Sequence, residues 1–410
     1  MRPMAGAEHQ QVGLKRRLTL PLLVFYGLGT IVGAGIYVLI GAVADRAGIY
    51  APAAFLLSAL IAGLTAHSYA ELSAQMPRSA GEVVYVRRAF QKPLLATVTG
   101  IAVVVTGVVS AATIANGFAG YLGVFLDNPT WLVITVFVAA LCVVAVWGIL
   151  ESVMLASLIT LLSIIGLLIV VALSGDVLLT LPDRWPELLP PLESGVWAGI
   201  TFGAFLAFYA FIGFEDMVNV AEEVKDPRRT MPLAIYTALT LAAILYVLVA
   251  VVAVLALDVD ALAASEAPLV DVVAAAGNQR AGGMIALFSL LSVTNSALAQ
   301  VIMASRILYG MARDGALPAW LAAVSPGTGT PVRATLFTGL IVLVFALALP
   351  LVTLAEITSF VIIVVFALVN AACFKLRLAG GRRIAVIPLV AMLLCLSLLA
   401  VQSYLRLLAQ

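Results

Sequence analysis

Charged residues are scarce in this 410-residue sequence, where Asp, Glu, Lys and Arg together make up 10%, against about 25% in an ordinary soluble domain. Apolar residues account for 63%. A single soluble core stops growing near about 250 to 300 residues, and two soluble domains would need far more charge to cover their surfaces. The composition therefore excludes a soluble protein.

An excess of either charge is also missing, because 22 Lys and Arg residues face 21 Asp and Glu residues for a net charge of +1. Proteins that bind nucleic acid present a basic patch or a basic excess. We therefore expect no nucleic-acid partner.

Metal-binding and nucleophile motifs are absent as well. The three cysteines, Cys142, Cys373 and Cys395, lie in separate apolar runs, and the only histidines are His9 and His67. This spacing excludes a disulfide framework, a thiolate metal site and a histidine cluster. The sequence also lacks the His-Glu-x-x-His, Gly-x-Ser-x-Gly and Walker patterns. We expect no metal site, no resident cofactor and no enzymatic activity.

Long apolar runs, in contrast, are abundant. Runs of about 20 residues can cross a bilayer as helices, since lipid does not tolerate unpaired backbone groups. We count eleven and predict an all-α membrane protein in contact with the lipid bilayer, with spans near residues 18–44, 52–75, 94–126, 131–149, 152–174, 196–224, 231–257, 282–310, 332–350, 354–377 and 384–407.

Lys and Arg fall mainly on one side of these spans. The N-terminal segment and every second loop carry 18 of them, and the opposite loops carry four, namely Arg46, Arg184, Arg280 and Arg406. Basic residues accumulate on the cytoplasmic side of membrane proteins. The count predicts a multi-pass protein of the cell membrane with a cytoplasmic N-terminus.

The spans predict one membrane domain. Residues 1–17 form a cytoplasmic segment, residues 18–378 form the core, and residues 379–410 add one further helix. Spans 1 to 5 (residues 18–174) and 6 to 10 (residues 196–377) form two blocks of five. Because five is odd, the second block enters the membrane from the opposite side, as in 5+5 inverted-repeat transporters.

Span 1 holds four glycines, Gly27, Gly29, Gly33 and Gly35, although each glycine costs about 1 kcal/mol in a helix interior. Gly29 and Gly33 have the spacing of a close helix contact, which is the better interpretation for this motif alone. A break from Gly33 to Gly35 would instead expose backbone amides that bind a carboxylate.

Span 6 contains a glycine followed by two acids, Gly213, Glu215 and Asp216. In a continuous helix the acids would lie at the membrane interface. A break at Gly213 would place them beside a cavity. Glycine-interrupted spans at matching positions of two blocks indicate the central site of a transporter.

At these positions the sequence resembles the amino acid-polyamine-organocation permeases, and among them bacterial relatives of the cationic amino acid transporters. The resemblance covers residues 18–378. It rests on four motifs in order: residues 29–37, residues 68–72 with 77–82, residues 210–215 with 221–228, and residues 305–318 with 329–333.

The resemblance implies secondary active transport of amino acids by alternating access, with broken helices 1 and 6. The substrate carboxylate would bind the amides of Gly33, Ala34 and Gly35. Its amino group would bind carbonyls, and Phe211 and Phe208 would line the side-chain pocket or gate it. The residues whose carbonyls would accept from this amino group are Ile31, Tyr209, Ala210 and Ile212. Alternatives are an amino acid exchanger, a polyamine or organic-amine permease, a channel and, disfavoured, an intramembrane enzyme.

Two positions bear on energy coupling. Glu215 stands where relatives carry an acid linked to the inner gate. Ser163 stands where several proton-coupled relatives carry a lysine, and with Ser289, Ser292 or Thr294 it could line an uncharged site suited to Na⁺. Coupling to Na⁺, coupling to H⁺ through Glu215 and uncoupled exchange stay open, as does the alternative that Ser163 bonds only its own helix.

His67 and Glu71 lie four residues apart in span 2, on one helix face. They could relay a proton, but a structural hydrogen-bonded pair near the cytoplasmic end is the better interpretation.

Overall fold

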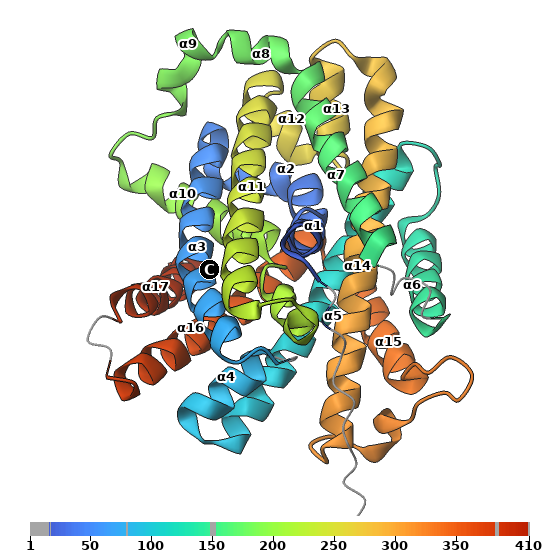
Figure 1. The fold of residues 1–410 in the computed structure, drawn as a ribbon. Helices are drawn as coiled ribbons and strands as arrows, with labels where there is room; N and C mark the ends of the chain where they lie inside the picture. The colour runs from blue at the N-terminus through green and yellow to red at the C-terminus, as the bar shows by residue number, and fades with distance from the viewer. Residues whose placement is uncertain (1–15, 17, 79–80, 148–152, 382–384, 409–410) are drawn as a thin grey trace, which may run out of the picture.

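The computed structural model describes residues 16, 18–78, 81–147, 153–381 and 385–408, and this part of the chain is helical (Figure 1). The long elements stand side by side as a bundle. They are α1 Leu20–Ile31, α2 Ala34–Ala47, α3 Ala51–Gln75, α5 Pro93–Gly123, α6 Thr130–Trp147, α7 Val153–Leu173, α10 Ser194–Ala207, α11 Pro227–Ala256, α14 Gly282–Arg313, α15 Val332–Ala348, α16 Leu351–Ala379 and α17 Val386–Leu408.

Within the described residues, eight helical runs are long and apolar enough to cross a membrane, and one of them, Ala34–Gln75, contains both α2 and α3. Three shorter apolar helices, Leu20–Ile31, Ser157–Leu173 and Val332–Ala348, complete the set. Each of the eleven expected spans coincides with one of these helices or with a broken pair. The predicted boundaries agree with the observed ones within four residues, except that the boundaries at 149, 152 and 384 lie outside the described residues.

Short helices at both ends of the bundle were not predicted, because they are too short to form an apolar run. Helix α4 lies at the lower end in Figure 1, and α8, α9, α12 and α13 lie at the upper end. Their bounds are α4 Gly81–Phe90, α8 Gly175–Leu179, α9 Leu181–Arg184, α12 Val259–Ala264 and α13 Pro268–Ala275. The described residues also form short 3-10 segments. One of them, η5 Glu215–Glu223, follows the break in span 6; the others here are η1 Gly48–Tyr50, η3 Trp185–Leu188, η6 Gln279–Ala281 and η7 Ala319–Ala322.

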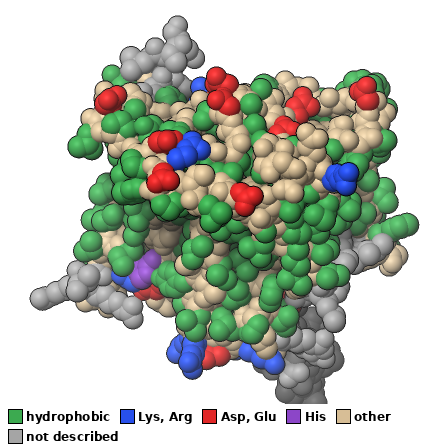
Figure 2. All heavy atoms as spheres, turned by 90° about the horizontal axis from the view of Figure 1, so that it is seen from above, with side chains coloured by type: hydrophobic (Ala, Val, Ile, Leu, Met, Phe, Trp, Pro, Cys, Tyr) green, Lys and Arg blue, Asp and Glu red, His purple; other side chains and the backbone are tan. Residues whose placement is uncertain are grey.

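The outer surface of the bundle is apolar. On α15, Leu336, Leu340 and Val344 are each more than half exposed and recur every four residues, so they form one stripe along the helix. Hydrophobic side chains cover much of the surface in Figure 2. A stripe of this kind fits a lipid environment.

Two helices near the centre are broken, as the glycines of spans 1 and 6 suggested. Helix α1 ends at Ile31 and α2 begins at Ala34. We expected the break at Gly33 to Gly35, but it lies at Val32 and Gly33, because Gly33 has a non-helical backbone and caps α2. Helix α10 ends at Ala207 and continues as the 3-10 turn η4, Phe208–Phe211; three irregular residues then separate η4 from η5.

The segment before α1 and the end of η5 are joined through their backbones. Leu18 and Val224 form an isolated parallel bridge. The Leu18 N–H donates to Glu223 O at 3.0 Å, and the Lys225 N–H donates to Leu18 O at 2.9 Å. The segment before α1 is therefore attached to the end of η5.

Packing around the breaks divides the neighbours into two groups. Helices α3 and α11 pack on each other, and they contact α10 and α1 respectively. Helices α7 and α14 pack on each other and on α1, while α5 joins α14 to α16. The two breaks therefore lie between these groups.

Candidate functional site

The two breaks meet through glycines, where backbones approach without side chains between them. A Cβ on Gly35 would lie 2.6 Å from Ala210 Cβ and 3.0 Å from its nitrogen. The first distance is shorter than real Cβ atoms show, and the second is shorter than nearly all observed Cβ contacts. Gly35 is therefore required for α2 to approach η4. The sequence of span 1 alone did not show this role.

A second contact joins Gly213 to the end of α1. Gly213 has φ of +126°, which favours glycine. Its carbonyl accepts a hydrogen bond from Thr30 Oγ1 at 2.8 Å, and its N–H donates to Glu215 Oε2 at 2.8 Å. Glu215 therefore holds the break in span 6 directly.

Backbone amides at the start of α2 come from Gly33, Ala34 and Gly35, the predicted carboxylate ligands. The first amides of a helix have no intrahelical acceptor, and the helix dipole favours an anion there. Gly33 itself faces α14, since a Cβ on it would overlap with Ser296 Oγ. A side chain at Gly33 would thus disturb the α14 packing as well as any ligand.

Two of the predicted carbonyl acceptors already accept hydrogen bonds within the protein. Ile31 O accepts a hydrogen bond from Tyr246 Oη at 2.6 Å, and Tyr209 O accepts one from the Ile212 N–H at 3.2 Å. A carbonyl oxygen has two lone pairs, so each can accept a second bond. Ala210 belongs to the same turn as Tyr209.

Aromatic rings surround the unwound segment of span 6. The rings of Phe208 and Phe366 lie 5.7 Å apart, and those of Phe211 and Tyr246 lie 5.3 Å apart. Tyr209 Oη is 2.8 Å from Ser110 Oγ. The sequence did not single out Phe366, Tyr246 or Ser110, because ordinary apolar runs surround them.

The site is closed to solvent in this conformation. Ile31, Ala34, Tyr209 and Ile212 are each at most 6% exposed, and Phe211 is fully buried. A ligand would need a movement of the surrounding helices to enter or leave.

Three acids are buried on the α4 side of the break. Glu82 of α4 is 3% exposed, Glu215 4% and Asp216 6%. Burial raises the pKa of the Glu82 carboxyl to about 7, and the charge of Asp216 acts in the same direction. Glu82 belongs to a motif that we quoted for the resemblance, but nothing in the sequence showed that α4 folds back onto η5.

Ser163 lies on α7, where its hydroxyl donates to Ile159 O of the same helix at 2.9 Å. Its own carbonyl accepts a hydrogen bond from Tyr37 Oη at 2.6 Å, which connects α7 to α2. The hydrogen bond within the helix is the alternative that we considered for this residue.

Other hydroxyls near the span 1 break come from α14. Ser289 and Thr294 donate to carbonyls of their own helix at 2.8 and 2.6 Å. Ser292 is 1% exposed, and its Oγ has no hydrogen-bond partner among the residues that the structure describes. It lies one turn before Ser296, which faces Gly33.

Comparison with known proteins fits this geometry. Residues 18–405 match the amino acid permease family. The chain belongs to this family. It is 33% identical to an uncharacterised transporter from Mycobacterium tuberculosis, over 94% of this chain and 86% of that one.

Two further relatives of this permease carry substrate names. It is 28% identical to the branched-chain amino acid permease BcaP of Bacillus subtilis, over 97% of this chain and 90% of that one. It is also 28% identical to the mitochondrial cationic amino acid transporter 3 of Arabidopsis thaliana, over 89% of this chain. The permease spans 63% of the length of the Arabidopsis protein. These relatives are transporters and permeases, not enzymes.

A solved structure shows the same fold. The permease aligns with a manganese transporter from Eremococcus coleocola with a TM-score of 0.66 and 12% identity, covering 96% of this chain and 89% of that one. The predicted fold class, an all-α inverted-repeat transporter with broken helices 1 and 6, is confirmed.

Proposed function

We propose that this permease is a secondary active transporter of amino acids that works by alternating access in the cell membrane, with its N-terminus in the cytoplasm. The supporting observation is the approach of the α2 N-terminus to the unwound segment Phe208–Ile212. Amides on one side and carbonyls on the other suit the two charges of a zwitterion, and neither group requires a charged side chain as its ligand.

We further propose that the substrate side chain is uncharged and apolar. The rings of Phe208 and Phe211 pack on other aromatic rings. A cationic side chain would need an acid facing it, and the carboxylate of Glu215 at this break already accepts from the Gly213 N–H. The name of the BcaP relative agrees with this proposal, and that of the Arabidopsis relative does not.

Tracer competition with purified protein in proteoliposomes tests both proposals. We expect excess leucine, isoleucine or valine to displace the tracer, and arginine, lysine and putrescine to leave it bound. Displacement by arginine alone would contradict the apolar pocket. Displacement by none of the twenty amino acids would contradict amino acid transport.

For energy coupling we propose Na⁺ bound beside the span 1 break, between α1, α7 and α14. The buried, unpartnered hydroxyl of Ser292 supports an oxygen-lined site. Uptake is measured under a Na⁺ gradient, a H⁺ gradient or internal amino acid alone. Na⁺ stimulation that is lost in Ser292→Ala would support the proposal. H⁺ stimulation that is lost in Glu215→Gln, or exchange without any gradient, would overturn it.

A further inference from the structure

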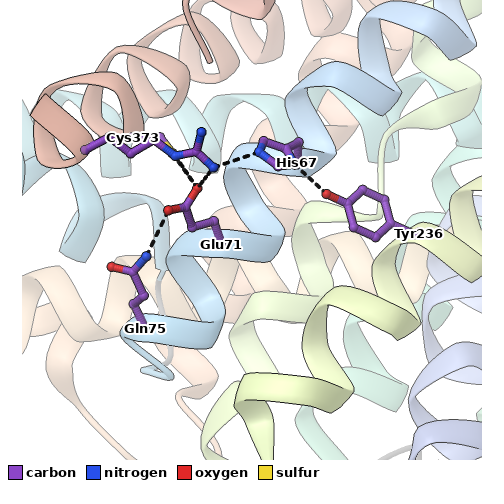
Figure 3. Close-up of polar contacts among 6 residues, drawn as sticks. His67, Glu71, Gln75, Tyr236 and Cys373 are labelled. Atoms are coloured by element: carbon purple, nitrogen blue, oxygen red, sulfur yellow. Dashed lines mark hydrogen bonds and ion pairs between the residues drawn. The ribbon is translucent and has the colours of Figure 1, made fainter. Parts of the chain in front are cut away.

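A polar network outside the candidate site connects three helices (Figure 3). Arg377 in the last turn of α16 donates through Nε to Glu71 Oε2 of α3 at 2.5 Å, and its Nη2 also contacts this oxygen. The same Nη2 lies 2.9 Å from Nε2 of His67. His67 Nδ1 lies 2.7 Å from Tyr236 Oη of α11. The expected pair of His67 and Glu71 is therefore completed by an arginine from another repeat.

These contacts fix the proton positions on His67. A guanidinium has only donors, so Nε2 must accept and carries no proton. In a neutral imidazole the other nitrogen is then protonated, and Nδ1–H donates to Tyr236 Oη. The geometry thus requires neutral His67 in one tautomer.

Protonation of His67 would break this arrangement. A proton on Nε2 would place N–H against N–H and two positive charges in contact, with the side chains of Arg377 and Glu71 only 15% and 12% exposed. Glu71 already accepts hydrogen bonds from Gln75 at 3.0 Å and from Cys373 at 3.8 Å. On α17, which also packs on α3, Cys395 contacts Thr65 and Asn370 instead.

The attachment of α16 at this point bears on the candidate site. Arg377 lies eleven residues after Phe366, about three turns along α16. The Phe366 ring contacts those of Phe208, Phe214 and Tyr69 at 5.1 to 5.7 Å. Release of Arg377 would therefore loosen the helix that covers the unwound segment.

We propose that His67 is a proton sensor in the latch between α16 and α3: neutral His67 accepts a hydrogen bond from Arg377 beside the Arg377–Glu71 ion pair, and protonated His67 loses this bond, weakens the latch and favours opening of the closed site. The effect on transport rests on the proposed function, whereas the proton positions do not.

Nitrogen NMR of ¹⁵N-histidine-labelled protein tests the latch directly. The sequence contains two histidines, and His9→Gln leaves His67 as the one labelled histidine, so both ring-nitrogen signals belong to it. At pH 7.5 we expect a protonated Nδ1 and an unprotonated Nε2, and we expect Arg377→Leu to abolish this fixed tautomer. A protonated Nε2 at pH 7.5, or a tautomer unaffected by Arg377→Leu, would overturn the proposal.

Transport measurements give the second readout. Lowering the pH on the cytoplasmic side from 7.5 to 5.5 should change the exchange rate about fivefold or more, the lower end of measured couplings. His67→Gln, which accepts from Arg377 but does not titrate, should lose the part of this response that His67 supplies. The matched control His9→Gln should retain the wild-type response. Equal pH responses in wild type and His67→Gln would refute the latch, whereas absence of amino acid transport with the expected tautomer would refute only the proposed function.

Discussion

At the scale of single residues, Glu82 is an acid that is buried although it lies outside the membrane-spanning helices. It is 3% exposed near the start of α4, and its neighbours include Asp216 of η5 and Tyr69 of α3. Helix α5, which packs on α4, has no charged side chain. Lys375 of α16 lies instead over the Phe90 ring at the other end of α4. The folded protein therefore favours neutral Glu82.

We expect Glu82→Gln to stabilise the protein at pH 8 and to have little effect at pH 4.5. Above pH 4.5 the unfolded chain loses the Glu82 proton, whereas the folded chain keeps it up to about pH 7. Stability is therefore lost between these values, by up to about 3 kcal/mol at about 1.4 kcal/mol per pKa unit. Thermal unfolding in detergent from pH 4.5 to 8 measures this, with exposed Glu193→Gln as the control. A pH-independent difference would contradict the interpretation.

The close approach of Gly35 to Ala210 makes a second prediction. Gly35→Ala should lower stability by about 1 to 3 kcal/mol, the usual cost of overpacking, and should weaken substrate binding. Gly63→Ala is a matched control, because Gly63 lies in α3 with nothing within 4 Å of its missing Cβ. It should leave binding unchanged and gain up to about 1 kcal/mol from helix propensity. Thermal shift with and without substrate measures both effects, and equal results for the two variants would disprove the contact.

At the scale of elements, local sequence revealed the two breaks and long-range packing completed them. Gly33 and Gly213 stood out because glycine interrupts apolar runs that otherwise favour helix. The break in span 1 begins one residue earlier than predicted. The positions of the glycines do not show which residue caps the helix, because the backbone conformation determines it. Arg377 and Phe366 were not predicted, because their partners lie more than 150 residues away and no local pattern marks such contacts.

The break in span 6 depends on the backbone of Gly213. Gly213→Ala should cost about 1 to 3 kcal/mol for its positive φ alone, and more because the new Cβ would lie 2.9 Å from the Ile31 nitrogen. Gly277→Ala shares a positive φ of +86° but has nothing within 4 Å. Uptake rates and thermal unfolding should therefore suffer more in Gly213→Ala. Similar losses in both variants would attribute the effect to φ strain alone.

At the scale of the whole molecule, apolar run lengths predicted the bundle, and the distribution of Lys and Arg predicted its orientation. The orientation places the end of the bundle that carries α4 in the cytoplasm and the end with α8, α9, α12 and α13 outside (Figure 1). The packing of the two repeats around the breaks could not be predicted, because it depends on contacts between helices that are far apart in sequence.

Labelling with a membrane-impermeant thiol reagent tests this orientation. Leu192, which is 97% exposed between η3 and α10, should react as Leu192→Cys in intact cells. Lys92→Cys, before α5, should react only after the membrane is permeabilised. The three native cysteines are buried and provide the background. Reversed reactivity would invert the predicted topology.

The bridge between Leu18 and Val224 has a mechanical consequence. Two backbone hydrogen bonds tie the segment before α1 to the end of η5, and the hydroxyl of Thr30 ties α1 to Gly213 at the other end of the same pair. Because the pair is connected at both ends, we expect α1 and η5 to move together about the glycine breaks. A displacement of either segment would then be transmitted to the other through these hydrogen bonds.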